Sequence, residues 1–123
     1  MFSFKRKIGN QAEQLSLSYL TEHGLQLIEQ NYLTRFGEID LIMLDNEQST
    51  LVFIEVRYRQ NSNFGSPIDS VTQTKQDKLI CTAKQYLQQH DQYDDFICRF
   101  DVIGLESDLK YPKITWIKDA FEA

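Results

Sequence analysis

Two acidic residues lie within short runs that otherwise favour buried β-strands. Asp40 lies in the run Ile39–Leu44, and Glu55 lies in the run Leu51–Val56. A carboxylate is costly to bury among apolar side chains unless a positive group or water meets it. The polar residues between the runs favour a hairpin. The fold must therefore bring a metal ion, a basic partner or bulk water to this hairpin.

The chain has 123 residues, of which 41% are apolar and 25% charged. These values are typical of a soluble globular protein, and we expect one domain over residues 1–123, with a core at about 9–118 and frayed ends. No apolar run approaches the roughly 20 residues that span a bilayer. The basic start is not followed by the apolar segment of a signal peptide. We therefore expect a cytoplasmic protein that does not associate with membranes.

The formal net charge of −5 argues against a protein that binds nucleic acid through its overall charge. It leaves room for a local basic patch. The candidates for such a patch are Lys5-Arg6-Lys7 and the set Arg57, Arg59, Lys75 and Lys78.

The two cysteines, Cys81 and Cys98, show neither CxxC spacing nor a nearby histidine pattern. Structural zinc is therefore not expected. We expect two reduced and mostly buried thiols.

Periodicity and turn signals predict the order helix, three strands, helix, and one or two strands. The expected helices cover residues 9–23 and 71–89, and the outer strands cover 25–31, 98–105 and 113–117. This order predicts an α/β fold in which helices flank a mixed sheet. The polar loop 60–70, which contains Phe64, could cover a site beside the Glu55 strand.

The first helix has a candidate N-cap at Asn10, with Glu13 at the third helical position as in a capping box. Gly24 is the expected stop signal, because glycine readily adopts the left-handed conformation past a helix end.

Residues i and i+2 of a strand face the same side, so Glu55 and Arg57 share a face. If the hairpin register places Asp40 beside Glu55 on that face, two carboxylates meet there. Such a pair suits Mg²⁺ or Mn²⁺, and metal-assisted phosphodiester hydrolysis is the matching chemistry. The alternative is a cross-strand ion pair of Asp40 with Arg57 or Arg59, which needs no metal.

The pattern Gly37-Glu38-Ile39-Asp40 followed by Ile54-Glu55-Val56-Arg57 resembles the D-(x)n-E-x-K core of the PD-(D/E)xK nuclease superfamily. More of the chain, roughly residues 9–118, resembles the YraN-type endonuclease-like family. The further matching residues are Glu13, Tyr19-Leu20, Asn31, the run 52–59, Phe64-Gly65, Lys75, Leu79, Ala83, Tyr86-Leu87 and Arg99-Phe100-Asp101-Val102-Ile103. The resemblance implies a restriction-endonuclease-like α/β core.

The resemblance also implies a metal site. Asp40 and Glu55 become ligands of Mg²⁺ or Mn²⁺, with the Val56 carbonyl as a third ligand. Glu13 matches an additional acidic residue that some superfamily members place on the first helix. Its alternative role is the capping one.

Arg57 departs from the motif, which has lysine at this position. Arginine has a pKa above about 12 and cannot act as a general base, although it can bind phosphate through two hydrogen bonds. Lys75 extends the core-facing stripe of the second helix and could compensate. The alternative for Lys75 is a buried stem with a solvated head.

We therefore expect a nucleic-acid-binding domain that hydrolyses phosphodiesters with Mg²⁺ or Mn²⁺. Its partner would be DNA or RNA, including branched or structured forms, and a homodimer could enlarge the phosphate-binding surface. The alternative is a nuclease fold that has lost catalysis and binds nucleic acid or protein. The expected catalytic residues are Asp40, Glu55, Arg57 and Lys75; the metal ligands are Asp40, Glu55 and Glu13; the nucleic-acid contacts are Arg57, Arg59 and Lys75.

Overall fold

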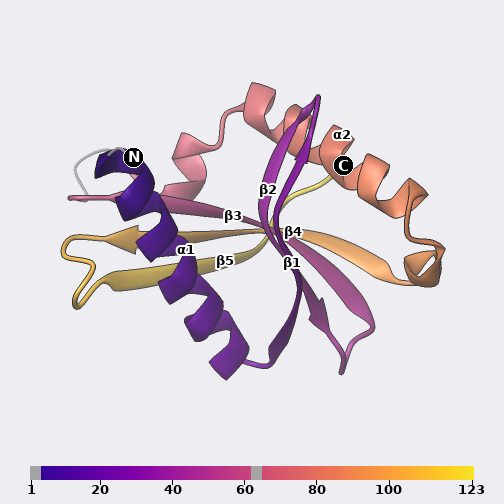
Figure 1. Cartoon of the computed structure of the whole chain (residues 1–123), viewed down its shortest axis with the longest axis horizontal. Helices are drawn as coiled ribbons and strands as arrows, with labels where there is room; N and C mark the ends of the chain where they lie inside the picture. The colour runs from indigo at the N-terminus through magenta and orange to yellow at the C-terminus, as the bar shows by residue number, and fades with distance from the viewer. Residues whose placement is uncertain (1–3, 62–64) are drawn as a thin grey trace.

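The computed structural model describes residues 4–61 and 65–123, with side chains from residue 7 onward. It confirms the α/β class and the order of elements (Figure 1). The elements are α1 (Phe4–Glu22), β1 (Leu25–Thr34), β2 (Gly37–Asp45), β3 (Thr50–Arg59), the 3₁₀ turn η1 (Pro67–Ser70), α2 (Gln73–Gln88), the 3₁₀ turn η2 (Asp91–Tyr93), β4 (Ile97–Glu106) and β5 (Lys113–Phe121).

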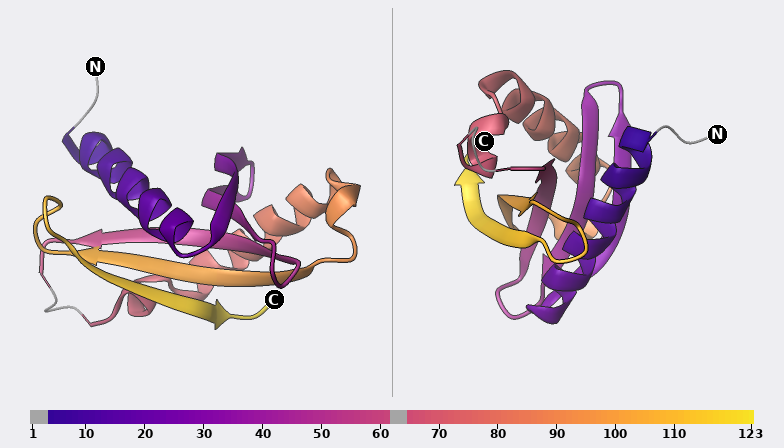
Figure 2. Two further views of the ribbon diagram at one scale, coloured as in Figure 1. Left: turned by 90° about the horizontal axis from the view of Figure 1, so that it is seen from below. Right: turned by 90° about the vertical axis from the view of Figure 1, so that its left-hand side faces the viewer.

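The strands form one mixed sheet in the order β1-β2-β3-β4-β5. The pairs β1–β2, β2–β3 and β4–β5 are antiparallel, and β3–β4 is parallel. A parallel pair needs a long crossover, and α2 provides it between β3 and β4. The two helices lie on opposite sides of the sheet (Figure 2).

Each face of the sheet carries its own hydrophobic core. The core under α1 is built on Ala12, Leu20, Leu25, Leu41, Met43, Val52, Ile54, Ile103, Leu105 and Leu109. The core under α2 is built on Ile39, Ile42, Leu51, Phe53, Val71, Leu79, Ala83, Tyr86, Phe100 and Val102. β3 alternates between the two cores, as the sequence predicts, and the stripe of α2 is confirmed.

The predicted start of the first helix is wrong. α1 begins at Phe4, so Asn10 and Glu13 lie inside the helix and form no cap. Ile8 packs against the α1 core, which draws the extra turn onto the sheet. This packing outweighs the cost of about 1 kcal/mol for a glycine, here Gly9, inside a helix. Gly24 does adopt a positive φ of 99° past the helix end, as predicted.

The strands at both edges are longer than predicted. β1 continues to Thr34, and β5 continues to Phe121 where a frayed tail was expected. Phe121 stacks on Phe100 with a ring-centroid distance of 4.9 Å, which holds the end of the chain against the sheet. The predicted helix 71–89 is shorter, because Thr72 caps it through a hydrogen bond from the Lys75 amide at 3.3 Å. Phe64 lies outside the described residues, as do the side chains of Lys5 and Arg6.

The expectation for the cysteines is wrong in one respect. Cys81 and Cys98 are free thiols, as expected, but both are exposed. Cys81 lies on the outer side of α2 rather than on its buried stripe. Cys98 is the second residue of β4, before the strand enters the core. An apolar-looking context in the sequence does not reveal which side of an element a small residue occupies.

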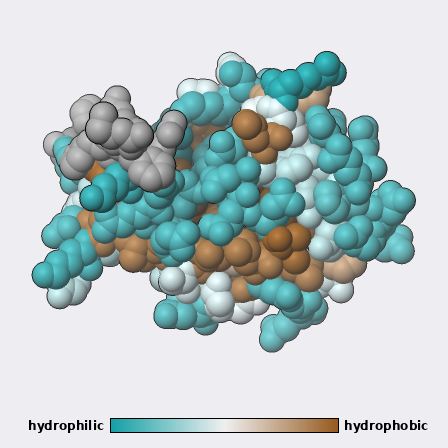
Figure 3. Space-filling model, in the orientation of Figure 1, coloured by the Kyte–Doolittle hydropathy of each residue, from teal (hydrophilic) through white to brown (hydrophobic). Residues whose placement is uncertain are grey.

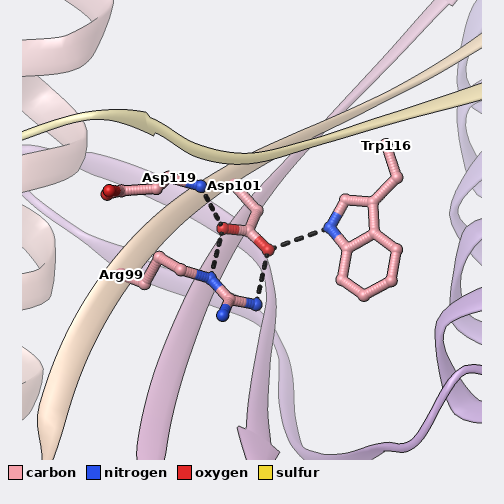
Figure 4. Close-up of polar contacts among 4 residues, drawn as sticks. All are labelled: Arg99, Asp101, Trp116 and Asp119. Atoms are coloured by element: carbon pink, nitrogen blue, oxygen red, sulfur yellow. Dashed lines mark hydrogen bonds and ion pairs between the residues drawn. The ribbon is translucent and has the colours of Figure 1, made fainter.

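Asp101 is a buried carboxylate that fastens β5 to β4 (Figure 4). Arg99 donates to it through Nε at 2.8 Å and Nη2 at 3.0 Å. Trp116 Nε1 and the Asp119 amide of β5 each donate at 2.9 Å. The pairing of the two strands shifts between Phe100 and Val102, where Asp119 has a positive φ of 52°. Asp101 therefore has a structural role in joining β5 to β4.

In the described part of the chain, neither helix is long and apolar enough to cross a membrane. On the face shown in Figure 3, hydrophilic side chains cover the periphery, and hydrophobic ones form a band across its lower middle.

Replacing Asp101 tests this fastening. Asp101→Ala should lower the free energy of unfolding by about 3 kcal/mol, because it leaves a mostly buried guanidinium and an indole N–H without their acceptor. Urea unfolding followed by circular dichroism measures the change. Asp119→Asn is the matched control: it keeps the donating amide and tolerates a positive φ, so its stability should stay near wild type. Equal stability of both variants would contradict a structural role for the Asp101 carboxylate.

Candidate functional site

The sheet divides between β2 and β3 at Asp40. The ladder between these strands ends at the pair Leu41 and Ile54. Beyond it β2 continues with β1 as far as Gly37, and β3 continues with β4 as far as Arg59. In Figure 1 the β1–β2 hairpin accordingly stands across the direction of β3, β4 and β5.

Asp40 occupies the point of division. Its Oδ2 accepts a hydrogen bond from the Val56 amide at 2.8 Å. Because the ladder between β2 and β3 has ended at Ile54, β2 offers this amide no backbone acceptor, and the side chain of Asp40 takes that place. Strict alternation in β2 also breaks here, since Ile39 and Ile42 both pack in the α2 core while Leu41 packs in the α1 core. Alternation along β2 therefore does not determine the side on which Asp40 lies, and its carboxylate lies between the two strands.

Glu55 meets Asp40 at the same point. The two side chains share a hydrogen bond. Glu55 lines a pocket of about 160 Å³ on the α2 side and a second pocket of about 260 Å³ on the α1 side, which Asp40 also lines. Burial raises the pKa of Glu55 to about 9, with further contributions from the hydrogen bond and the charge of Asp40. This shift favours the protonated form of Glu55 at neutral pH.

Glu13 of α1 faces this pair from the other side. It lines the α1-side pocket with Asp40 and Glu55. Burial and the charges of Asp40 and Glu38 raise its pKa to about 7. With its amide oriented to satisfy both neighbours, Asn31 donates to Glu13 at 2.8 Å and to Glu38 at 2.9 Å. Glu13 therefore lies beside the two expected metal ligands. Its alternative role as part of a capping box is excluded, because α1 begins at Phe4.

Two cations stand on the α2 side of the carboxyl pair. Arg57 and Lys75 line the pocket that contains Glu55, and both oppose the rise in its pKa. Arg57 Nε donates to Ser70 Oγ at 2.9 Å, and Ser70 in turn donates to the Pro67 carbonyl at 2.7 Å. Lys75 is exposed. Its position in the first turn of α2 brings its charge toward the sheet, as the helical stripe predicts.

The other expected contacts are only partly present. Arg57 donates to Ser70 and does not form the ion pair with Asp40 that the sequence left open. Among the described residues, an ion pair is formed by Arg99 and Asp101 instead. Arg59 lies further along β3, where Nη1 reaches the Gly65 carbonyl at 3.5 Å.

Two contributors to the site, Ser70 and Glu38, were not predicted. Ser70 fixes Arg57. Lys78, a candidate for the basic patch, is exposed and lines the same pocket as Lys75. Glu38 adds a carboxyl group to the cluster. Its place two residues before Asp40 was the available signal. The position of Ser70 depends on Gly104 of β4, where a β-carbon would collide with the ring of Pro67.

The residues present suit an incompletely enclosed cation site. Among the described residues, no three His, Cys, Asp or Glu side chains are grouped closely enough to form a ready-made metal cage. Mg²⁺ does not require one, because it is usually held by one or two carboxylates and keeps several waters. The Asp40 and Glu55 side chains lie within hydrogen-bonding reach of each other, where one cation could bridge the two carboxyl groups.

The chain matches the model of a protein family described as "Uncharacterised protein family UPF0102" over residues 12–105. Among its relatives, a UPF0102 protein of Psychromonas ingrahamii is 56% identical over 111 residues, which cover 90% of this chain and 86% of the relative. One from Coxiella burnetii is 51% identical over 122 residues, covering 99% and 98%. One from Pseudomonas syringae is 43% identical, covering 98% and 97%. The YraN-like family expected from the motifs is thereby confirmed.

The shared proton predicts an unusual dependence of stability on pH. Between pH 4.5 and about 9 the unfolded chain releases the proton of Glu55 and the folded chain retains it. The free energy of unfolding should therefore fall as the pH rises through this window. Glu55→Gln removes the contribution of Glu55 to this dependence while keeping a hydrogen-bond donor for Asp40; the contribution of Glu13, whose pKa is about 7, stays in both proteins. In thermal melts in a metal chelator, its melting temperature should exceed that of wild type at pH 8 and approach it near pH 4.5.

The control is Glu47→Gln, in the exposed β2–β3 turn. It should track wild type at every pH. A Glu55→Gln curve parallel to wild type from pH 4.5 to 9 would contradict a buried, protonated Glu55.

Proposed function

Because the chain belongs to the uncharacterised protein family UPF0102, its function must be argued from its site, and we propose a metal-dependent, nuclease-like domain of the PD-(D/E)xK superfamily. It binds nucleic acid and hydrolyses a phosphodiester bond. The observation that carries this proposal is the contact of Asp40 with Glu55 at the division of the sheet, with Arg57 and Lys75 beside it. Two carboxyl groups backed by cations suit a metal-bridged phosphate better than an apolar or a neutral ligand.

Asp40 and Glu55 would hold Mg²⁺ or Mn²⁺, with Glu13, which lines the same pocket, as the further acidic ligand. The bound ion would polarise the phosphate and lower the pKa of the attacking water. Glu55 must release its proton before it can ligate, because a metal binds the carboxylate form. Asp40 is already positioned for this role by the Val56 amide.

Arg57 and Lys75 contribute positive charge where the substrate's phosphate would lie. Arg57 is held by Ser70 through Nε, and its outer nitrogens can donate to phosphate oxygens. Lys75 lines the same pocket as Glu55 and Arg57. It is therefore the candidate to orient the attacking water in place of the motif lysine.

The second candidate function is binding without cleavage. The observation that favours it is Arg57, because a guanidinium cannot act as a base and this one is tied to η1 by its hydrogen bond to Ser70. In that case the site binds nucleic acid or a protein but does not hydrolyse it. The choice between DNA and RNA, a preference for branched substrates, the cytoplasmic location and the homodimer stay predictions.

Metal binding is the first test. Isothermal titration with Mn²⁺ or Mg²⁺ should show one site on the wild type, lost in Asp40→Asn, Glu55→Gln. Each ion should displace close to one proton at pH 7, since the pKa of Glu55 is about 9. Titrations in two buffers of different ionisation enthalpy measure this release. Absence of binding at millimolar metal would contradict the catalytic proposal.

Cleavage is the second test. Wild type and Arg57→Lys should be assayed with Mn²⁺ on single-stranded, duplex and branched DNA and RNA, with Asp40→Asn as the inactive control. If Lys75 supplies the missing function, Lys75→Ala should lower the cleavage rate by about 10²-fold, the usual contribution of general acid–base catalysis. Activity in Arg57→Lys alone would instead identify the wild type as a nuclease fold that has lost catalysis.

A further inference from the structure

A further pocket, distinct from the two that contain Glu55, lies beyond the turn of the β1–β2 hairpin. It has a volume of about 700 Å³ between this turn and the outer side of α2. Its lining residues are Arg35, Phe36, Cys81, Lys84, Gln85, Gln88 and Gln89. Both charged residues in this set are cations, on a chain whose net charge is −5. The pocket therefore concentrates positive charge and amide groups at one place on an acidic protein.

The hairpin turn separates this pocket from the candidate site and lies directly on α2. Gly37 lies in packing contact with α2, because a β-carbon there would lie 3.5 Å from Lys78 Cβ and from Thr82 Oγ1. Thr34 Oγ1 lies 3.4 Å from Thr82 Oγ1. Gly37 and Lys78 also line the pocket that contains Glu55. The two pockets thus lie on either side of the two-residue turn Arg35-Phe36 and the adjoining Gly37.

The turn presents a guanidinium and an aromatic ring to solvent. Arg35 stacks over the ring of Phe36 with its guanidinium carbon 4.9 Å from the ring centroid. Phe36 remains 38% exposed although it is aromatic. Thr34 Oγ1 accepts from the Phe36 amide at 3.1 Å and donates to the Gly37 carbonyl at 3.3 Å, which fixes the turn.

An exposed aromatic ring beside a guanidinium is the surface on which unpaired bases stack. A lysine across the pocket supplies the contact for the connecting phosphates. Bases within a duplex do not offer their faces to such a ring. The chemistry therefore selects a single strand over a duplex.

We propose that the pocket formed by the hairpin turn and α2 binds an unpaired stretch of a DNA or RNA strand whose neighbouring phosphodiester lies at Asp40 and Glu55. Phe36 and Arg35 stack on a base, and Lys84 contacts a phosphate. Lys78 continues the positive charge toward Lys75. The proposal rests on the proposed function for the position of the scissile bond, but the binding of a single strand does not require cleavage.

Binding is measured by fluorescence anisotropy with labelled single-stranded DNA, single-stranded RNA and blunt duplex DNA, in EDTA so that nothing is cut. Arg35→Ala, Phe36→Ala should bind either single strand at least tenfold more weakly, the effect of losing one stacked base. Lys84→Ala should lower the slope of log affinity against log salt by about one. Wild type should prefer single strands to the blunt duplex.

The chain offers a matched control at the other hairpin. Lys110 lies over the ring of Tyr111, 5.8 Å from its centroid, and Tyr111 is 80% exposed. This pair lies in the β4–β5 turn, at the opposite end of the molecule in Figure 1 from α2. Lys110→Ala, Tyr111→Ala removes the same kinds of group and should bind as wild type does. Circular dichroism establishes that each variant is folded, and Lys84→Ala tests the pocket from α2 if the turn variant is not.

The outcomes separate this inference from the proposed function. Loss of single-strand binding in the turn variant, with no metal binding by wild type, would support the pocket and overturn the nuclease site. Cleavage by wild type with unchanged binding in the turn and Lys84 variants would do the reverse. A preference for blunt duplex, binding of no nucleic acid, or equal losses in the two hairpin variants would overturn the pocket proposal.

Discussion

The hydrogen bond from the Val56 amide to Asp40 determines how this sheet can divide. Where β2 leaves β3, the amide would otherwise lose its partner inside the fold, at a cost of about 1–3 kcal/mol. Asp40 supplies that partner at 2.8 Å. A carboxylate at this position can therefore serve the fold and also leave its second oxygen available. The same division places the β1–β2 hairpin over α2. The pocket that contains Glu55 and the pocket beyond the hairpin turn both depend on this placement.

Asp40 and Glu55 repel each other when both are ionised, so their contact needs a proton or a cation to reduce the negative charge. In the protein alone this role falls to the proton on Glu55, whose pKa is about 9 because burial and Asp40 together outweigh Arg57 and Lys75. A divalent cation satisfies the same two carboxyl groups and restores their charged forms. A proton and a metal ion therefore compete for these carboxyl groups. As the pH rises, the free energy of unfolding should fall and the affinity for metal should increase.

The sequence predicts much of this arrangement and fails for identifiable reasons. The hairpin, the parity of β3 and the buried stripe of α2 follow from periodicity, and they already place Glu55, Arg57 and Lys75 on one side. The start of α1 was missed because packing of Ile8 overrides a cap signal at Asn10. The position of Asp40 could not be read from alternation, since the irregularity lies in β2 itself. Ser70 was missed because η1 reaches Arg57 only through a tertiary contact at Gly104.

The distribution of charge resolves the apparent conflict between an acidic chain and a nucleic-acid ligand. The carboxyl groups of Glu13, Glu38, Asp40 and Glu55 are gathered at the division of the sheet, where a cation would neutralise part of their charge. The cations that face them, Arg57, Lys75 and Lys78, line the α2 side, and Arg35 and Lys84 continue beyond the hairpin turn. On the α2 side these cations lie beside Glu38 and Glu55, so a polyanion that approaches along α2 meets positive charge next to the carboxyl groups that a metal ion would bridge. Overall charge then governs the rate of approach and its salt dependence, while these local groups govern where the strand lies.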